Sequence, residues 1–259
     1  MKHSGIMLAL LLCGGAQADA SPQAIFSCMR NNLPPSLSVR TVELSGSDSN
    51  GATRLLKGTL SAAATGQPGA VSVRLKIEDP PYLAGAAYLI RHSDSTQRDD
   101  MFVYLPSVKR VRHIVGTLAD GSLLGTNFSY DDFKQLQTAF DGASAQLGLG
   151  EDVDGRASDV LLLSPDPAEH SPYSSVKAWV ERKSCVVIKA EFNVGKNVRK
   201  RLTSPADALK QSGSYWYLAQ MEITDLVDHS STVLRTLGIS NVGTVSPQTF
   251  DPTAFYRAP

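Results

Sequence analysis

The sequence predicts a mainly β (α+β) protein whose strands form one large antiparallel sheet, curved into an open or half β-barrel. Segments in which apolar and polar residues alternate recur along most of the chain, as half-buried strands require. Short polar connections join them without regular helices between, which favours antiparallel pairing over β-α-β units. One amphipathic helix in mid-chain needs an apolar surface to cover, and the concave face of a curved sheet provides one.

Residues 1–20 carry the features of a cleaved signal peptide. The basic stretch MKHSG precedes the apolar stretch IMLALLLCGG, and AQADA contains two small-x-small cleavage sites. The apolar stretch is well short of the roughly 20 residues that span a membrane. Lipid modification of Cys13 is the alternative, although Leu12 is larger than the residue that usually precedes such a cysteine. We expect an exported protein whose residues 21–259 form a single domain.

Composition limits the classes of partner. The chain has 25 basic and 25 acidic residues and a formal net charge of zero. Nucleic-acid binding depends on neutralising many phosphates, so no nucleic-acid partner is expected. The hydrophobic content of 42% is sufficient for a sizeable core.

Two cysteines remain after cleavage, Cys28 and Cys185. An oxidising compartment favours a disulfide between them, which would tie an N-terminal helix to a strand in the second half of the chain. The alternative is two separate buried thiols. The helix is predicted because Ile25, Phe26 and Met29 recur at helical spacing before two prolines.

The clearest strand is residues 70–79, AVSVRLKIED, in which apolar residues occupy every second position from 71 to 77. That pattern predicts one buried face and one solvated face. The other predicted strands are residues 37–46, 54–62, 86–92, 101–106, 156–165, 175–183, 185–192, 215–227 and 231–237.

The mid-chain helix is predicted over residues 130–140. Ser129 and Asp132 have the spacing of a capping box, and acidic residues in the first turn suit the positive end of the helix dipole. Phe133, Leu136 and Phe140 form one apolar stripe, which is expected to cover the concave face of the sheet.

The sequence contains no recognisable catalytic, cofactor or metal motif. It lacks G-x-S-x-G, H-E-x-x-H, C-x-x-C and glycine-rich phosphate loops. The histidines of the mature chain, His92, His113, His170 and His229, are widely scattered. We therefore expect a protein that is not an enzyme and that uses neither a cofactor nor a metal. A triad assembled from distant residues is the alternative.

A basic stretch follows the predicted strand 101–106. Lys109, Arg110, Arg112 and His113 lie on both faces of the segment 107–114, which is expected to be extended and cannot be fully buried unless these charges are paired. One interpretation is a solvated edge strand protected by positive charge. The other is a cationic rim around an apolar cavity, suited to anionic lipid headgroups.

The order of these motifs resembles the LolA-like family of periplasmic outer-membrane lipoprotein-sorting proteins. The resemblance is carried by Tyr104-Leu105-Pro106, by the basic stretch KRVR at 109–112, and by GTNFSYDD at 125–132. Cys28 before NLP, the segment PPYLAGAAYL, and VKAWVERKSCVVIKAEF with the second cysteine also fit. Together these motifs extend over most of the mature chain.

The resemblance implies an open antiparallel barrel with helices closing an apolar cavity, as in LolA and LolB, located in the periplasm. It implies a carrier that shields the acyl chains of a lipid or lipoprotein, with transient membrane contact. An inner-membrane transporter of the resistance–nodulation–division (RND) type and an outer-membrane acceptor are the implied partners. A non-catalytic accessory protein of such an exporter or of an envelope complex is the alternative. The residues expected at the cavity and its rim are Tyr104, Leu105, Lys109, Arg110, Arg112, Phe128, Tyr130, Phe133, Leu136 and Phe140.

Overall fold

An open antiparallel sheet dominates the computed structural model, which describes residues 21–34, 36–67, 70–93, 98–243 and 246–258. The predicted signal peptide, residues 1–20, lies outside the described residues. The strands of the described part are β1 (Leu37–Ser47), β2 (Thr53–Ala64), β3 (Val71–Asp79), β4 (Ala87–Ser93), β5 (Arg98–Leu105), β6 (Arg110–Ile114), β7 (Ser144–Leu147), β8 (Glu151–Val153), β9 (Arg156–Ser164), β10 (Ser175–Glu181), β11 (Val187–Val194), β12 (Asn197–Thr203), β13 (Leu209–Ser212), β14 (Tyr215–Leu218), β15 (Gln220–Asp225) and β16 (Ser230–Val242).

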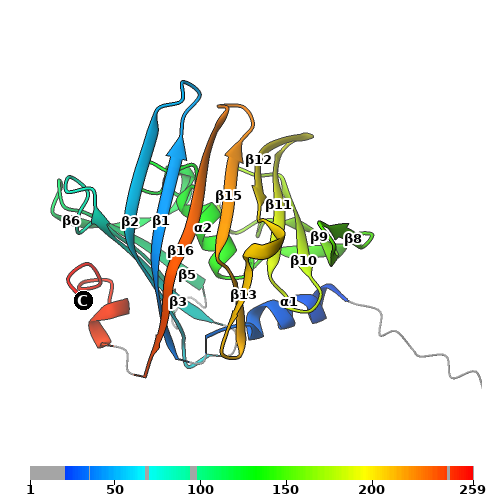
Figure 1. Cartoon of the computed structure of the whole chain (residues 1–259), viewed down its shortest axis with the longest axis horizontal. Coiled ribbons are helices and arrows are strands. Elements are labelled where there is room, and N and C mark those ends of the chain that lie inside the picture. The colour runs from blue at the N-terminus through cyan, green and yellow to red at the C-terminus, as the bar shows by residue number, and fades with distance from the viewer. Residues whose placement is uncertain (1–20, 35, 68–69, 94–97, 244–245, 259) are drawn as a thin grey trace, which may run out of the picture.

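Fourteen strands form one sheet, in the order β6-β5-β4-β3-β2-β1-β16-β15-β12-β11-β10-β9-β7, with β8 also paired to β9. Strand β1 pairs with the last strand, β16, and so joins the two halves of the chain at the centre of the sheet (Figure 1). The edge strands β6 and β7 are not paired with each other, so the sheet remains an open half barrel. The predicted fold class is confirmed.

The helices are α1 (Pro22–Asn31) and α2 (Tyr130–Gln137), with short 3-10 turns η1 (Gly116–Asp120), η2 (Ala206–Ala208) and η3 (Pro247–Phe250). Figure 1 shows α2 behind strands β16 and β15, and α1 across the lower end of the strands near β13. Ser129 and Asp132 form the predicted capping box of α2. Phe133 of α2 and Met29 of α1 belong to the same buried core as the apolar residues of the sheet, so both helices cover its concave face.

The helix α2 is shorter than predicted. It ends at Gln137 rather than at residue 140, because Ala139 and Phe140 have positive φ angles of 55° and 56°, which a right-handed helix cannot continue through. Phe140 is nevertheless buried in the core from the turn that follows.

The predicted strand 215–227 is two strands. Strands β14 and β15 flank Ala219, whose backbone bonds to Ala208 on one side and to Thr236 on the other. Strand β14 therefore leaves the large sheet and pairs with β13 in a separate hairpin. Alternation predicts that a segment is extended but not which strand it pairs with.

The polar face of β3, predicted to be solvated, is covered at Ser72 and Arg74 but exposed at Glu78. Arg74 on that face is only 2% exposed, and its Nη1 donates to the carbonyl oxygens of Phe255 (3.3 Å) and Ala258 (3.1 Å). The segment 247–258 lies on the outer side of the sheet, where Phe255 packs against Ala87 and Leu89 of β4. The C-terminal segment thus supplies a second layer that alternation within β3 could not reveal.

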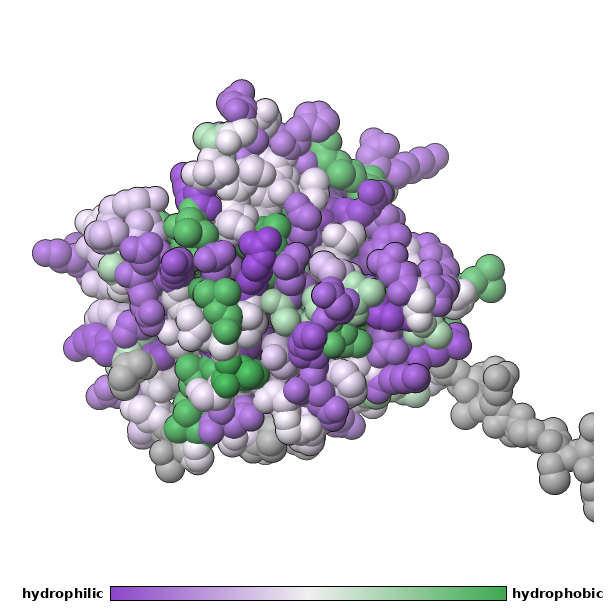
Figure 2. All heavy atoms as spheres, in the orientation of Figure 1, coloured by the Kyte–Doolittle hydropathy of each residue, from purple (hydrophilic) through white to green (hydrophobic). Residues whose placement is uncertain are grey.

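The outer surface is mostly hydrophilic, with separate apolar patches in the view of Figure 2. Exposed apolar residues of the central strands include Leu55 of β2 and Leu237 of β16. Isolated apolar residues of this kind are ordinary on protein surfaces.

Candidate functional site

A cavity of about 140 Å³ lies within the half barrel, between α1, the end of α2 and the β13–β14 hairpin. Its walls are largely apolar, because the concave residues of the sheet meet the inner faces of both helices there. The apolar residues that line it include Met29, Leu33, Ala62, Val71, Val73, Leu136, Val187, Leu202, Leu218 and Met221.

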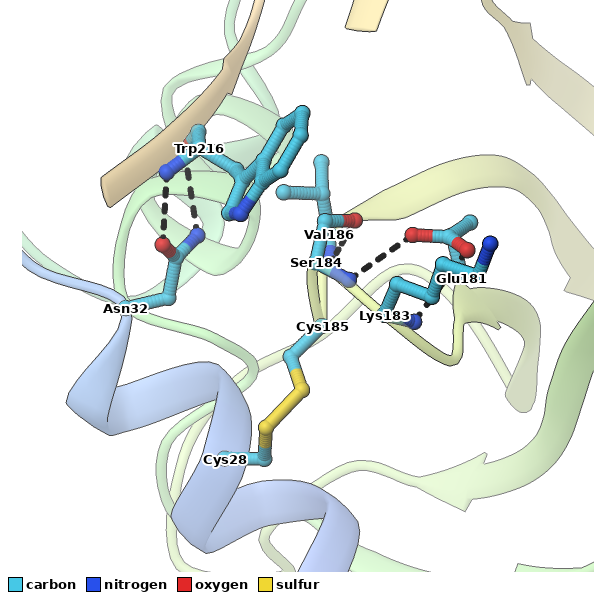
Figure 3. Close-up of a disulfide and its surroundings, with 8 residues drawn as sticks. All are labelled: Cys28, Asn32, Glu181, Lys183, Ser184, Cys185, Val186 and Trp216. Atoms are coloured by element: carbon cyan, nitrogen blue, oxygen red, sulfur yellow. Dashed lines mark hydrogen bonds between the residues drawn. A yellow bond between two sulfur atoms is a disulfide. The ribbon is translucent and has the colours of Figure 1, made fainter. Parts of the chain in front are cut away.

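Two links across the chain hold one side of the cavity together (Figure 3). The predicted disulfide joins Cys28 of α1 to Cys185, with 5.7 Å between their Cα atoms, so the alternative of two free thiols is wrong. Asn32, just after α1, donates from Nδ2 to the Trp216 carbonyl (3.0 Å) and accepts from the Trp216 N–H (2.8 Å). Helix α1 is therefore fixed both to the loop before β11 and to the hairpin.

The loop that carries Cys185 is shaped by Glu181. Its carboxylate accepts hydrogen bonds from the backbone N–H groups of Lys183 (3.1 Å) and Ser184 (2.8 Å), as Figure 3 shows. Burial by itself would raise the pKa of Glu181, but these hydrogen bonds and the Lys183 charge lower it overall. The ionised carboxylate thus holds the turn that presents Cys185, whose φ is 58°.

Arg40 brings a positive charge to the wall of this cavity. It lies on the same face of β1 as Val42 and Leu44, which belong to the core. Its guanidinium lies over the Tyr217 ring, 5.4 Å from the centroid. Its Nε is enclosed without a hydrogen-bond partner, and burial lowers the pKa of the group, although an arginine remains charged.

A buried polar cluster anchors α2. The Asp132 side chain is inaccessible to solvent, and it accepts hydrogen bonds from Lys200 Nζ (2.7 Å) and from the Tyr173 hydroxyl (2.7 Å). Lys134 donates to Glu169 at 2.7 Å and lies 3.8 Å from Asp131. These contacts connect α2 to β12 and to the loop before β10. The helix is held more firmly than an apolar stripe alone would hold it.

Burial raises the pKa of Asp131 to about 6, and the Asp132 charge adds to this rise. The Lys134 charge and a hydrogen bond from Gln135 act in the opposite direction. Asp131 is thus a carboxylate that titrates near neutrality inside the anchoring cluster.

Of the predicted site residues, only Leu136 lines the cavity itself. Phe128, Phe133 and Phe140 fill the adjacent core and are almost inaccessible. Leu105 and Tyr130 pack at the margin of the same core. The structure therefore brings these apolar residues together, but most of them occupy packed interior rather than open space.

The basic residues lie apart from the cavity, at one edge of the sheet. Residues 107–109 form a turn between β5 and β6 rather than an extended segment, and Lys109 has a φ of 51°. Arg110 and Arg112 are exposed and share the core-facing side of β6 with buried Ile114. Arg112 is close enough to Tyr130 for its charge to lower the pKa of that phenol, against the larger, raising effect of burial.

Tyr104 points away from the concave side. Its ring stacks on that of Tyr256 with 3.8 Å between centroids, within the outer cluster formed by the C-terminal segment. Nearby on β6, His113 stacks on Phe102 at 4.8 Å. The aromatic residue of the Tyr-Leu-Pro motif thus holds the C-terminal segment in place.

Four residues at these contacts were not predicted as functional, namely Arg40, Asn32, Tyr215 and Lys200. One signal was present for Arg40, which shares its parity with Val42 in the alternating segment 37–46 and so places a charge on an apolar face. The others meet partners far away in sequence, as Ser38 and Tyr215 do through a 2.6 Å hydrogen bond. No local pattern reports such pairs.

Comparisons with known proteins agree with this geometry. A family model described as an uncharacterized protein matches residues 72–257, well over half of the chain. The chain belongs to the family of uncharacterized proteins that this model describes, and its fold is LolA-like. A comparison with curated proteins finds no match.

Three crystal structures share the LolA-like fold. A DUF1329 family protein from Desulfovibrio piger has a TM-score of 0.78 and 21% identity, covering 90% of this chain and 98% of that one. A putative outer membrane lipoprotein-sorting protein domain from Vibrio parahaemolyticus has a TM-score of 0.77 and 21% identity, covering 89% and 95%. A LolA superfamily protein from Nitrosomonas europaea has a TM-score of 0.66 and 17% identity, covering 90% and 98%.

Two further findings concern the described residues alone. None of the helices within them is long and apolar enough to cross a membrane. In the same part of the chain, no group of three or more His, Cys, Asp or Glu side chains is placed to hold a metal ion.

Proposed function

We propose that this LolA-like protein is a periplasmic, non-catalytic carrier that shields the acyl chains of a lipid or lipoprotein during transfer towards the outer membrane. Each CH₂ group of an acyl chain that leaves water gains about 0.8 kcal/mol, so a carrier needs an apolar enclosure rather than a reactive group. The observation that carries the proposal is the apolar cavity between the sheet and its covering elements. The disulfide supports an oxidising compartment.

Loading requires this cavity to expand. A volume of about 140 Å³ is close to the roughly 150 Å³ that accommodates a single benzene-sized molecule, which is too small for an acyl chain. Among the described residues, β13 and β14 form strand pairs only with each other, so their movement would break the hydrogen bonds of Trp216 to Asn32 and of Tyr215 to Ser38 but not the ladder of the large sheet. Helix α2 is anchored by buried ion pairs, and we therefore assign opening to the hairpin.

The direct test is native mass spectrometry of protein purified from the periplasm without detergent, followed by extraction of bound material. A stoichiometric lipid or acylated peptide is expected, and its mass would name the cargo class. Protein that stays empty after incubation with envelope lipids would contradict the carrier role.

A second candidate is an accessory protein of an RND-type exporter or envelope complex that uses the same fold without carrying lipid. The packed interior favours it, since Phe128, Phe133 and Phe140 fill much of the space beneath the sheet. Affinity purification from crosslinked cells separates the two roles. An accessory protein would recover a stoichiometric inner-membrane transporter while remaining empty in the mass spectrometer.

A further inference from the structure

Arg40 places a cation at an apolar cavity without a carboxylate to neutralise it. Within the described residues, no Asp or Glu oxygen comes within 4.0 Å of its guanidinium. The residues that line the cavity include a second arginine, Arg30, but no acidic residue. Arg30 is partly exposed and lies 3.7 Å from Asp141, whereas the Arg40 Nε is enclosed and unbonded.

An enclosed charge without a counter-ion destabilises a protein, because it loses hydration that nothing else replaces. The neighbours of Arg40 compensate only in part. The Tyr217 ring face attracts the cation at 5.4 Å, and the Tyr215 hydroxyl, which also bonds to Ser38, forms a side-chain hydrogen bond with the guanidinium. A guanidinium offers five N–H donors in a planar fork, so capacity remains for an anionic ligand.

We propose that Arg40 binds the anionic head group, a carboxylate or a phosphate, of a single-chain amphiphile whose tail occupies the cavity. The proposal rests on the carrier role above and adds the chemical class of the ligand. Two oxygens of either head group match the guanidinium fork in a bidentate contact. Apolar side chains such as Leu136, Val73 and Met29 line the same cavity and would contact the tail.

A structural role for Arg40 predicts something different. If its contact with Tyr217 only fastens the β14 strand to β1, its removal would lower the melting temperature without altering which head group is preferred. If Arg40 is an anion site, a neutral residue of similar length removes an uncompensated charge, and the empty protein should be as stable or more stable.

The test measures displacement of a neutral fluorescent probe by three ligands with the same tail: dodecanoate, dodecyl phosphate and dodecanol. The variants are Arg40→Gln and Arg40→Met, so that one misfolded variant does not decide the outcome. The control is Arg235→Gln, which removes an arginine of the adjacent strand β16 that pairs with Glu43 at 3.9 Å. Melting temperatures of all empty proteins are recorded alongside.

The wild type and Arg235→Gln are expected to bind at least one anionic ligand about 10-fold more tightly than dodecanol, the range of a charge-assisted hydrogen bond. The Arg40 variants should lose this preference while keeping their affinity for dodecanol. A preference for dodecanoate over dodecyl phosphate would identify a fatty-acid carboxylate, and the reverse a phosphate. Equal affinity of the wild type for all three, or a preference that survives in folded Arg40 variants, would overturn the proposal alone. Failure of all three ligands to bind would also count against the carrier role.

Discussion

At the scale of single residues, the pair formed by Asp132 and Lys200 is the main polar support of α2. Asp132 serves its own helix as a capping residue and also accepts from Lys200 at 2.7 Å. Water has little access to either side chain, since Asp132 is 0% and Lys200 13% exposed. Breaking such a pair from one side leaves the other charge buried and unpaired.

Replacing Lys200 with glutamine should lower the free energy of unfolding by about 3 kcal/mol, because it leaves the buried Asp132 carboxylate without its cationic partner. The matched control is Arg201→Gln in the same strand, whose ion pair with Glu191 has a half-exposed arginine and should be worth less than about 1 kcal/mol. Urea unfolding of both variants measures the difference. Equal losses would show that the Asp132 carboxylate is not stabilised by Lys200.

Asp131 makes stability depend on pH. Its pKa of about 6 in the folded protein exceeds its ordinary value of 3.8, so the folded state binds the proton more tightly than the unfolded state. Stability from this group is therefore greatest below about pH 4 and is lost as pH rises through 6.

The Asp131→Asn variant should match the wild type near pH 4 and exceed it by about 3 kcal/mol above pH 7, since one pKa unit corresponds to about 1.4 kcal/mol. Unfolding measured across this range tests the sign. A variant that is less stable than the wild type at pH 7.5 would mean that the contact with Lys134 outweighs burial.

At the scale of elements, α1 is held by covalent and polar links rather than by pairing in the sheet. Its disulfide connects positions 157 residues apart, and Asn32 connects its end to the hairpin. The cavity lies between these two elements and the end of α2. Its shape thus depends on α1 staying in place.

Replacing both Cys28 and Cys185 with serine should reduce the free energy of unfolding by about 4–5 kcal/mol, because the disulfide restricts the unfolded chain. Denaturant unfolding under oxidising conditions measures the loss. The control is the wild type unfolded with a reductant, which should show a similar loss. Free-thiol labelling of protein from the periplasm should fail before reduction; rapid labelling would contradict a formed bridge.

At the scale of the whole molecule, the formal net charge is zero. Electrostatic attraction to a membrane therefore depends on local clusters of charged residues. Lys109, Arg110, Arg112 and His113 are exposed together at the β5–β6 edge of the half barrel. This position suits both interpretations of the stretch, a protected edge strand and a cationic rim. A cationic rim would attract anionic lipid by about 1 kcal/mol for each basic residue near the surface.

Reversing charge with Arg110→Glu and Arg112→Glu should weaken binding to vesicles that contain anionic lipid, and the effect should fade at high salt. Cosedimentation with anionic and neutral vesicles measures it. The control reverses a distant charge, Arg201→Glu, on strand β12. Unchanged vesicle binding by the double variant would leave β6 as a protected edge strand only.

The fold class, the capping box of α2 and the core positions of the most regularly patterned segments could be predicted from the sequence. These follow from short-range periodicity and spacing, which act between neighbours in the chain. The alternation in 70–79 placed Val73 and Ile77 in the core correctly. The disulfide could be predicted because the mature chain has only two cysteines, which allow a single pairing, and because an oxidising compartment favours their oxidation.

The tertiary structure establishes which surfaces of the protein meet. It placed the C-terminal segment over β3, turned Tyr104 outward, and moved β14 out of the main sheet to close a cavity. It also brought Arg40 beside Tyr215 and Tyr217. These contacts join residues far apart in the chain, and their energies depend on burial and partner geometry, which local sequence patterns do not encode.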